Sequence, residues 1–246
     1  MNFSCRLFFV VLFFVGNAIL SAGTALNPEP QHRDPYDWDA RHEEVCRRNK
    51  KLSPDYIFIG DSIVHHWGGE PASVRPPAQG ADSWERLFAK RKVTNAGFGF
   101  DYIDNAYYRV ENGELDGFKP RVILILLGTN NLFHLKDKPD VCVDKMKSLL
   151  KLVQKKQPRA KILLIGVLPR KEPASPSLIG ATNEGLKKLA DGKRVFYLDA
   201  SLALAQKNGE IADSQYMRDV VHPNKSGYER LALQIEEMLK QIERSR

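Results

Sequence analysis

Cysteine is scarce in this sequence, and the cysteine patterns that build disulfide-rich or zinc-binding domains are missing. The chain has three cysteines in 246 residues and contains no Cys-x-x-Cys pair. A disulfide-stapled scaffold and a zinc ribbon are therefore excluded. Hydrophobic residues make up 43% and charged residues 27% of the chain. This composition is that of an ordinary globular protein and excludes a disordered or low-complexity chain.

Several sequence signatures of common enzyme and binding classes are also absent. The chain has no Walker sequence and no Gly-x-Ser-x-Gly elbow, and the glycines at 97 and 99 lack the third glycine of a dinucleotide fingerprint. The net charge of +7 favours anionic partners in general. Because Lys and Arg are spread through the predicted helices and balanced by acids, we expect no nucleic-acid partner.

Long apolar runs are confined to the amino terminus. Residues 7–20 are nearly all apolar, Arg6 precedes them, and small residues follow. This order is typical of a secretory signal peptide, and the run is short for a bilayer span of about 20 residues. We expect residues 1–25 to be cleaved near Ala22–Ala25 and the mature protein to be exported, periplasmic or secreted, without stable membrane insertion. An uncleaved membrane anchor is the alternative.

The mature chain would keep two cysteines, Cys46 and Cys142. An exported location permits a disulfide between them, and two buried thiols are the preferred alternative. Residues 26–35 are rich in proline and are expected to be a linker, whereas residues 36–51 are polar and predict a surface helix. We therefore divide the mature chain into a linker and N-terminal helix over 26–53 and one domain over 54–246.

Short apolar runs alternate with helical patterns along that domain. Apolar residues from Tyr228 to Ile242 step by three or four positions, which predicts a long helix. The runs at 122–127 and 162–168 are almost entirely aliphatic, as in strands buried on both faces of a parallel sheet. Five strands alternating with helices predict a doubly wound α/β domain. The expected strands are Tyr56–Ile59, Lys92–Asn95, Val122–Leu127, Ile162–Leu168 and Val195–Leu198.

Ligands of such a sheet bind at the carboxyl ends of its strands, where this sequence places several polar residues. Ser62 follows the first strand, Asn130 follows the third, and Asp219 and His222 precede the last helix. Each has a simple structural alternative, as a helix N-cap, a turn cap or a pair at a helix start. Taken together, they supply the nucleophile, base, orienting group and hydrogen-bond donor that acyl transfer needs.

The spacing of Asp219 and His222 suits that chemistry. A carboxylate three residues before a histidine can reach its Nδ1–H and leave Nε2 to accept the proton of Ser62. Further histidines lie near these motifs without the spacing of metal ligands, so we expect no metal and no cofactor. They are His65, His66 and His134.

These motifs resemble the four blocks of the SGNH (GDSL) hydrolase superfamily, in the same order, over residues 55–240. Longer stretches, such as FIGDSIV and VVHPNKSGYERLA, are similar to the platelet-activating-factor acetylhydrolase catalytic subunits and their secreted bacterial relatives. The resemblance makes residues 54–246 an SGNH hydrolase domain. The four blocks are Gly60-Asp61-Ser62, the glycine-rich stretch at 97–101, Gly128-Thr129-Asn130-Asn131 and Asp219-x-x-His222.

The resemblance implies a three-layer α/β/α, flavodoxin-like fold whose five-stranded parallel sheet has the order 2-1-3-4-5. It implies a serine esterase with Ser62 as nucleophile, His222 as base and Asp219 as the orienting carboxylate. The alternatives are a lipid esterase of the acetylhydrolase or lysophospholipase type and a non-catalytic binding protein on the same fold. Intact catalytic residues count against the binding protein. A homodimer is suggested by the resemblance alone.

The resemblance also implies an oxyanion hole. Its donors would be the Ser62 backbone N–H, a backbone N–H at Gly99 or Phe100, and the Asn130 side chain. Phe100 stands where the family has a glycine, and its ring would narrow the pocket toward a small acyl group such as acetyl. With export, this predicts a small ester or acetylated glycan as substrate. The insertion at 68–83 is expected near the site, with Arg75 more suited to solvent than to an anionic substrate.

Overall fold

The computed structural model describes residues 26–33, 35–72, 77–171, 175–205, 211–217 and 219–245. The predicted signal peptide, its cleavage region and Arg75 lie outside these residues. Among the helices described, none combines the length and the apolar character needed to cross a membrane.

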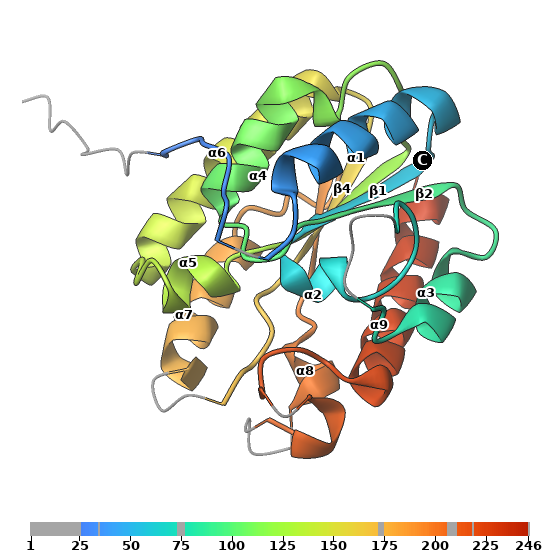
Figure 1. The fold of residues 1–246 in the computed structure, drawn as a ribbon. Coiled ribbons are helices and arrows are strands. Elements are labelled where there is room, and N and C mark those ends of the chain that lie inside the picture. Colours follow the sequence, from blue (N-terminus) through green and yellow to red (C-terminus); the bar gives the residue numbers. More distant parts are fainter. Residues whose placement is uncertain are drawn as a thin grey trace, which may run out of the picture.

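Five strands form one parallel sheet in the order β2-β1-β3-β4-β5 (Figure 1). The predicted flavodoxin-like topology is therefore confirmed. Two predicted strand ends were wrong by two or three residues: β2 continues to Gly97 because it pairs with β1 as far as Gly60, and β4 stops at Ile165, opposite the last residue of β3. The other predicted ends differ by at most one residue. The strands are β1 (Tyr56–Gly60), β2 (Val93–Gly97), β3 (Val122–Leu126), β4 (Lys161–Ile165) and β5 (Val195–Leu198).

Helices cover both faces of the sheet (Figure 1). One face is covered by α1 (Trp38–Leu52), α4 (Ile103–Arg109), α6 (Pro139–Lys156) and α7 (Ser175–Lys187), and the other by α3 (Ala81–Phe88), α8 (Ser201–Leu204) and α9 (Lys225–Arg244). The short elements are α2 (Ser62–His65), α5 (Thr129–Phe133), a π-helical turn (Val110–Glu114) and a 3-10 turn (Asp213–Gln215).

Alternate residues of each central strand enter the two cores. In β1, Ile57 and Ile59 pack beneath α1 and α4, whereas Phe58 packs beneath α3 and α9. All five residues of β1 and of β3 are buried. Because side chains on both faces of the sheet are buried, neither strand carries a polar side chain, and each appears in the sequence as a continuous apolar run.

Helix α1 is buried more deeply than its polar sequence suggests. Trp38 and Val45 belong to the core, and Arg41 is fully buried. The Arg41 guanidinium donates to the carbonyl oxygens of Gly97 (2.8 Å) and Pro71 (3.1 Å), which satisfies a charged group away from water. The predicted surface helix thus has one face that seals the edge strand β2.

The two cysteines of the predicted mature chain are free thiols. Cys142 is buried and Cys46 half-buried, so the preferred expectation of two buried thiols holds fully only for Cys142. Burial raises the pKa of each thiol to about 12, and both therefore stay protonated at neutral pH.

Candidate active site

The turn after β1 presents Ser62 at the first position of α2. Asp61 is the N-cap of this helix, and its carboxylate accepts the Ile63 N–H at 2.9 Å. A Cβ on Gly60 would lie 2.2 Å from Val64 Cγ2, so the tight strand-to-helix turn requires glycine there. The alternative that Ser62 is the helix cap is therefore wrong, because Asp61 already makes the capping bond.

Three residues from distant parts of the chain form one hydrogen-bonded row at the carboxyl edge of the sheet. His222 Nε2 lies 2.7 Å from Ser62 Oγ, although the residues are 160 positions apart, and His222 Nδ1 lies 2.8 Å from Asp219 Oδ2. The other oxygen, Asp219 Oδ1, accepts the backbone N–H of Val221 and of His222, each at 3.0 Å. The loop before α9 thus holds the carboxylate and the imidazole in one orientation.

The charge state of Asp219 follows from these contacts. Partial burial acts to raise the pKa of its carboxyl, but the hydrogen bonds from His222 and Val221 outweigh burial and lower the pKa below its usual value. The carboxylate is therefore ionised at neutral pH and accepts a proton only as a hydrogen bond. This arrangement assigns the imidazole proton to Nδ1 and leaves Nε2 as the acceptor facing Ser62.

The loop after β2 lies beside the nucleophile turn, since Phe98 N–H donates to the Gly60 carbonyl at 3.0 Å. Gly99 N–H donates to His65 Nδ1 at 3.0 Å and is therefore occupied. Phe100 N–H has no acceptor among the residues that the structure describes. Of the two backbone donors that the sequence leaves open, only Phe100 is unengaged.

Asn130 lies in α5 and reaches across to the same loop. Its side-chain Nδ2 donates one hydrogen to the Asp101 carbonyl at 3.1 Å, which leaves the second hydrogen available. The residue is almost completely buried. Because the side chain bonds a separate loop 29 positions away, Asn130 is not the local turn cap that was one alternative.

The ring of Phe100 is partly exposed beside these donors. Its side chain is 37% exposed, and its centroid lies 5.5 Å from that of His134, just after α5. The backbone of Phe100 has φ +59°, in the left-handed region that favours glycine. An aromatic residue thus occupies a position whose conformation suits the glycine of the family.

The three histidines near the motifs surround the site but do not form a metal centre. His65 accepts the Gly99 N–H, His66 stacks on His222 with centroids 4.8 Å apart, and His134 contacts Phe100. Within the described parts of the chain, no three His, Cys, Asp or Glu side chains come together as metal ligands would.

Sequence reasoning missed two residues around the site, Gln31 in the predicted linker and Tyr36 at the start of the predicted surface helix. Gln31 Nε2 donates to the Gly99 carbonyl at 2.7 Å, and Tyr36 OH donates to the same oxygen at 3.3 Å. No local pattern marks either residue. The one signal for Gln31 would have been its burial within a proline-rich segment, and burial of a polar residue cannot be recognised from the sequence.

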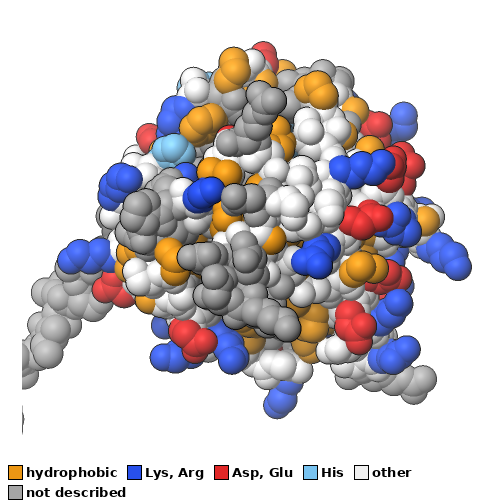
Figure 2. Space-filling model, turned by 90° about the horizontal axis from the view of Figure 1, so that it is seen from below, with side chains coloured by type: hydrophobic (Ala, Val, Ile, Leu, Met, Phe, Trp, Pro, Cys, Tyr) orange, Lys and Arg blue, Asp and Glu red, His pale blue; other side chains and the backbone are white. Residues whose placement is uncertain are grey.

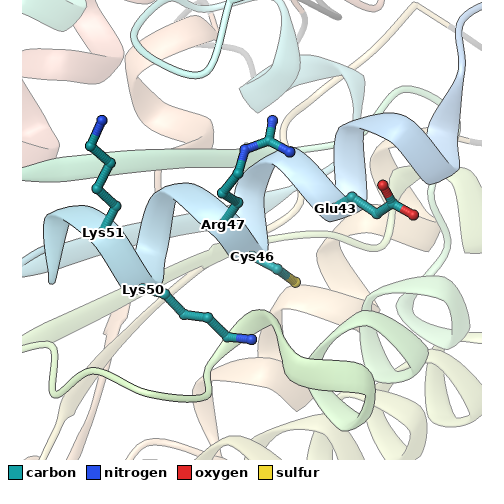
Figure 3. Close-up of a pocket in the computed structure, with 5 residues that line it drawn as sticks. All are labelled: Glu43, Cys46, Arg47, Lys50 and Lys51. Atoms are coloured by element: carbon teal, nitrogen blue, oxygen red, sulfur yellow. The ribbon is translucent and has the colours of Figure 1, made fainter.

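A hollow of about 580 Å³ lies away from these residues, on α1 (Figure 3). Arg47 and Lys51 point to one side of the helix and Lys50 to the other. These residues precede β1, at the edge of the sheet opposite Ser62. Figure 2 shows the molecule from below, where Lys and Arg side chains are interspersed with Asp and Glu. The hollow on α1 contributes no residue to the Ser62 region.

Comparison with known proteins places the chain among esterases. The GDSL-like lipase/acylhydrolase family matches residues 58–230. The chain is 30% identical to the platelet-activating factor acetylhydrolase IB subunit alpha2 of Homo sapiens, over 83% of this chain and 84% of the relative. Among solved structures, a GDSL-like lipase from Bacteroides thetaiotaomicron superposes with a TM-score of 0.58 at 16% identity, covering 82% of this chain and 98% of that one. A carbohydrate esterase family 3 protein from Talaromyces cellulolyticus superposes with 0.54 at 19% identity, covering 76% and 97%.

Proposed function

The chain belongs to the GDSL-like lipase/acylhydrolase family of carboxylic ester hydrolases, and we propose that Ser62, His222 and Asp219 are its catalytic triad. The observation that carries this proposal is the row of two hydrogen bonds from Ser62 Oγ through the imidazole to the Asp219 carboxylate. In that row the serine has a base within proton-transfer distance, and the base has an orienting carboxylate.

The reaction then proceeds through an acyl-enzyme. Ser62 Oγ attacks the ester carbonyl carbon while His222 Nε2 takes the hydroxyl proton, and the ionised Asp219 stabilises the resulting imidazolium. The tetrahedral intermediate collapses, the alcohol leaves with the proton from His222, and the acyl group stays on Ser62. Water, deprotonated by the same imidazole, attacks the acyl carbon; the bond from that carbon to Ser62 Oγ then breaks, the imidazolium returns its proton to Oγ, and the acid is released.

We propose three oxyanion donors: the backbone N–H groups of Ser62 and Phe100, and the free Nδ2 hydrogen of Asn130. Gly99 leaves the predicted set, because its N–H is bonded to His65. Donors of this kind act on the charge that develops in the transition state, and each contributes about 3–4 kcal/mol in comparable sites.

The acyl group that fits best is acetyl, and we propose an acetylated carbohydrate as the substrate class. The exposed Phe100 ring beside the unengaged Phe100 N–H would restrict the space for the acyl chain. One relative is named as an acetylhydrolase, and one structural neighbour as a carbohydrate esterase. An aromatic face also suits the apolar side of a sugar ring.

A lipid ester is the second candidate. The named acetylhydrolase relative favours it, as does a second exposed apolar side chain, Leu135, next to His134 along the chain. We further propose that the protein is exported after removal of residues 1–25, on the strength of the apolar run there.

The decisive experiment is acid release by the wild-type protein and by Ser62→Ala. The substrates are p-nitrophenyl acetate, longer p-nitrophenyl esters, acetylated xylan, an O-acetylated sialic acid and an acetylated phospholipid. Ser62→Ala is expected to lower kcat about 10⁴- to 10⁶-fold while the circular dichroism spectrum and Tm stay close to the wild type. A matched control is Ser148→Ala, whose hydroxyl donates to the Asp144 carbonyl within α6 at 3.0 Å.

The substrate panel separates the two candidates. Ser62-dependent release from the glycans, with little activity on longer chains, supports the carbohydrate esterase. Preference for the phospholipid would replace it with the lipid esterase. Turnover that survives in Ser62→Ala would overturn the triad.

A further inference from the structure

We propose that residues 26–33, which we name the N-terminal strap, position the oxyanion hole, with Gln31 as the positioning residue. The proposal rests on the function proposed above, since it concerns the Phe100 N–H of that site. The strap was predicted as a linker. In the structure it crosses the loop after β2 and the start of α4 before the chain enters α1 (Figure 1).

The strap acts on one particular peptide group, the one between Gly99 and Phe100. Its carbonyl oxygen, on Gly99, accepts from Gln31 Nε2 at 2.7 Å and from Tyr36 OH at 3.3 Å. Its N–H, on Phe100, has no acceptor among the described residues. A trans peptide is planar, and its C=O and N–H point in opposite directions. Holding the carbonyl toward the strap therefore holds the N–H away from it.

The preceding peptide group, between Phe98 and Gly99, is hydrogen-bonded at both its N–H and its carbonyl. These bonds oppose a rotation of the whole loop. Gly99 N–H donates to the buried His65 ring at 3.0 Å, and the Phe98 carbonyl accepts the Asp101 N–H at 3.2 Å. The Gly99–Phe100 peptide is thus the one peptide group of the loop that is free to rotate. Its oxygen is held by Gln31 of the strap and by Tyr36, just before α1.

The conformation of Phe100 explains why such an anchor is needed. Its φ of +59° is unfavourable for any residue with a Cβ, and contacts elsewhere must maintain it. A glycine at this position would adopt the same φ without that penalty. The strap therefore compensates for an aromatic residue placed where the backbone favours glycine.

Gln31 is itself held in one orientation. Its side chain is 2% exposed, and its Oε1 accepts the Arg33 N–H at 2.8 Å, which assigns Nε2 as the donor toward Gly99. Other strap contacts reach α4: Asn105 Nδ2 donates to the Glu29 carbonyl at 2.8 Å, and Arg33 Nη2 donates to Asn105 Oδ1 at 3.0 Å. Arg33 Nη2 also lies 3.4 Å from the Phe100 carbonyl oxygen. The strap is thus fixed by hydrogen bonds to α4 as well as by its covalent connection to α1.

The test compares two buried glutamines that both donate to backbone carbonyls. Gln31→Leu keeps the side-chain volume and removes the donor to Gly99. The control is Gln157→Leu, because Gln157 Nε2 donates to the Phe118 carbonyl at 3.0 Å at the opposite edge of the sheet. We expect Gln31→Leu to lower kcat for p-nitrophenyl acetate about 10- to 100-fold with KM changed less than twofold. Gln157→Leu should keep kcat within twofold at a similar loss of Tm.

A second variant covers the case in which Gln31→Leu does not fold. Tyr36→Phe removes the longer hydrogen bond to Gly99 and should lower kcat about two- to fivefold. A kcat that is unchanged in both Gln31→Leu and Tyr36→Phe, or lowered equally in Gln157→Leu, would overturn the positioning role.

A structural measurement keeps this inference distinct from the proposed function. In a crystal structure of Gln31→Leu, the Gly99–Phe100 peptide should be rotated from its wild-type orientation. If the peptide is unmoved, the strap proposal is wrong, whatever the activity. If wild-type turnover does not depend on Ser62 while the peptide rotates, the anchoring stands and the proposed esterase mechanism falls.

Discussion

Two neighbouring loops at the active edge are stabilised in different ways. The conformation of the turn after β1 is specified by its own residues: the Asp61 carboxylate accepts the Ile63 N–H, and the absence of a side chain on Gly60 leaves space for Val64. Hydrogen bonds from distant residues, among them Tyr228 OH to the Ile63 carbonyl, are added to that local conformation. The loop after β2 is held from elsewhere in the chain. Gln31 in the strap donates to the Gly99 carbonyl. Trp38 at the start of α1 and Arg109 at the end of α4 both donate to the Asp101 carboxylate.

The difference has a physical cause. The nucleophile turn is a strand-to-helix connection, a standard local conformation that a capping side chain and a glycine are enough to specify. The second loop must leave one N–H unbonded and carry Phe100 at a positive φ, which no local rule favours. Contacts of long sequence separation maintain it, so damage to distant residues should affect this loop more than the other.

The largest stability effect is expected at the buried ion cluster behind the second loop. Arg109 bonds Asp101 at 2.9 Å and also pairs with Glu114, and all three side chains have no exposed surface. Arg109→Met would leave the buried carboxyl groups of Asp101 and Glu114 without their cationic partner and should lower the free energy of unfolding by about 3–5 kcal/mol. Urea unfolding of the two proteins measures the difference.

Arg86→Met is the matched control for that variant. Arg86 pairs with Glu229 on the surface, where both side chains are about half exposed. Exposed pairs contribute about 0–1 kcal/mol, so this variant should unfold close to the wild-type midpoint. If Arg109→Met and Arg86→Met lowered the free energy of unfolding equally, the buried ion cluster would stabilise the loop after β2 no more than an exposed ion pair stabilises the surface. That result would contradict the stabilising role assigned to the cluster.

A catalytic effect is expected at Asn130, whose side-chain Nδ2 donates to the Asp101 carbonyl in the loop after β2. Asn130→Ala removes the Nδ2 donor and should lower kcat roughly 10²- to 10³-fold, because one oxyanion donor is lost. Asn112→Ala is the control, since Asn112 is an exposed residue whose Nδ2 donates to the Tyr108 carbonyl. Steady-state kinetics on p-nitrophenyl acetate would refute a role for Asn130 in the oxyanion hole if both variants kept wild-type kcat.

The smallest effect is expected at the locally held turn, and it depends on pH. Burial raises the pKa of Asp61 from its ordinary 3.8 to about 7. Between those values the folded protein keeps a proton that the unfolded chain has lost, so stability declines as pH rises through this window and levels off above pH 7. Asp61→Asn keeps an acceptor for the Ile63 N–H without the charge. It should be more stable than the wild type at pH 8, by on the order of 1–4 kcal/mol.

The advantage of Asp61→Asn should shrink as pH falls toward 4, which thermal melts across pH 4–8 would record. Asp82→Asn gives the opposite sign as a control. Asp82 pairs with Lys225, which lowers the pKa of its carboxyl, so neutralising it should not stabilise the protein at high pH. A constant difference between Asp61→Asn and the wild type across the whole range would contradict a raised pKa in the folded state.

Features specified by neighbouring residues could be predicted from the sequence, whereas features maintained by contacts distant in sequence could not. All five strands were predicted because aliphatic runs such as 122–127 mark strands buried on both faces. The meeting of Ser62 with His222 was predicted because parallel strands end at one edge. The burial of α1 was not predicted, because Arg41 has a polar head that is satisfied by carbonyls distant in sequence.

The amino-acid sequence was sufficient for what depends on local pattern: the strand runs, the position of Ser62 directly after the first strand, and the Asp219-x-x-His222 spacing. Hydrophobic periodicity and short-range hydrogen bonds leave direct traces in neighbouring residues. The choice of Phe100 over Gly99 as unengaged donor, and the part played by Gln31, emerged only when the chain was folded. Both depend on which hydrogen bonds form between residues more than 30 positions apart, and such pairings are set by packing rather than by any neighbour in the chain.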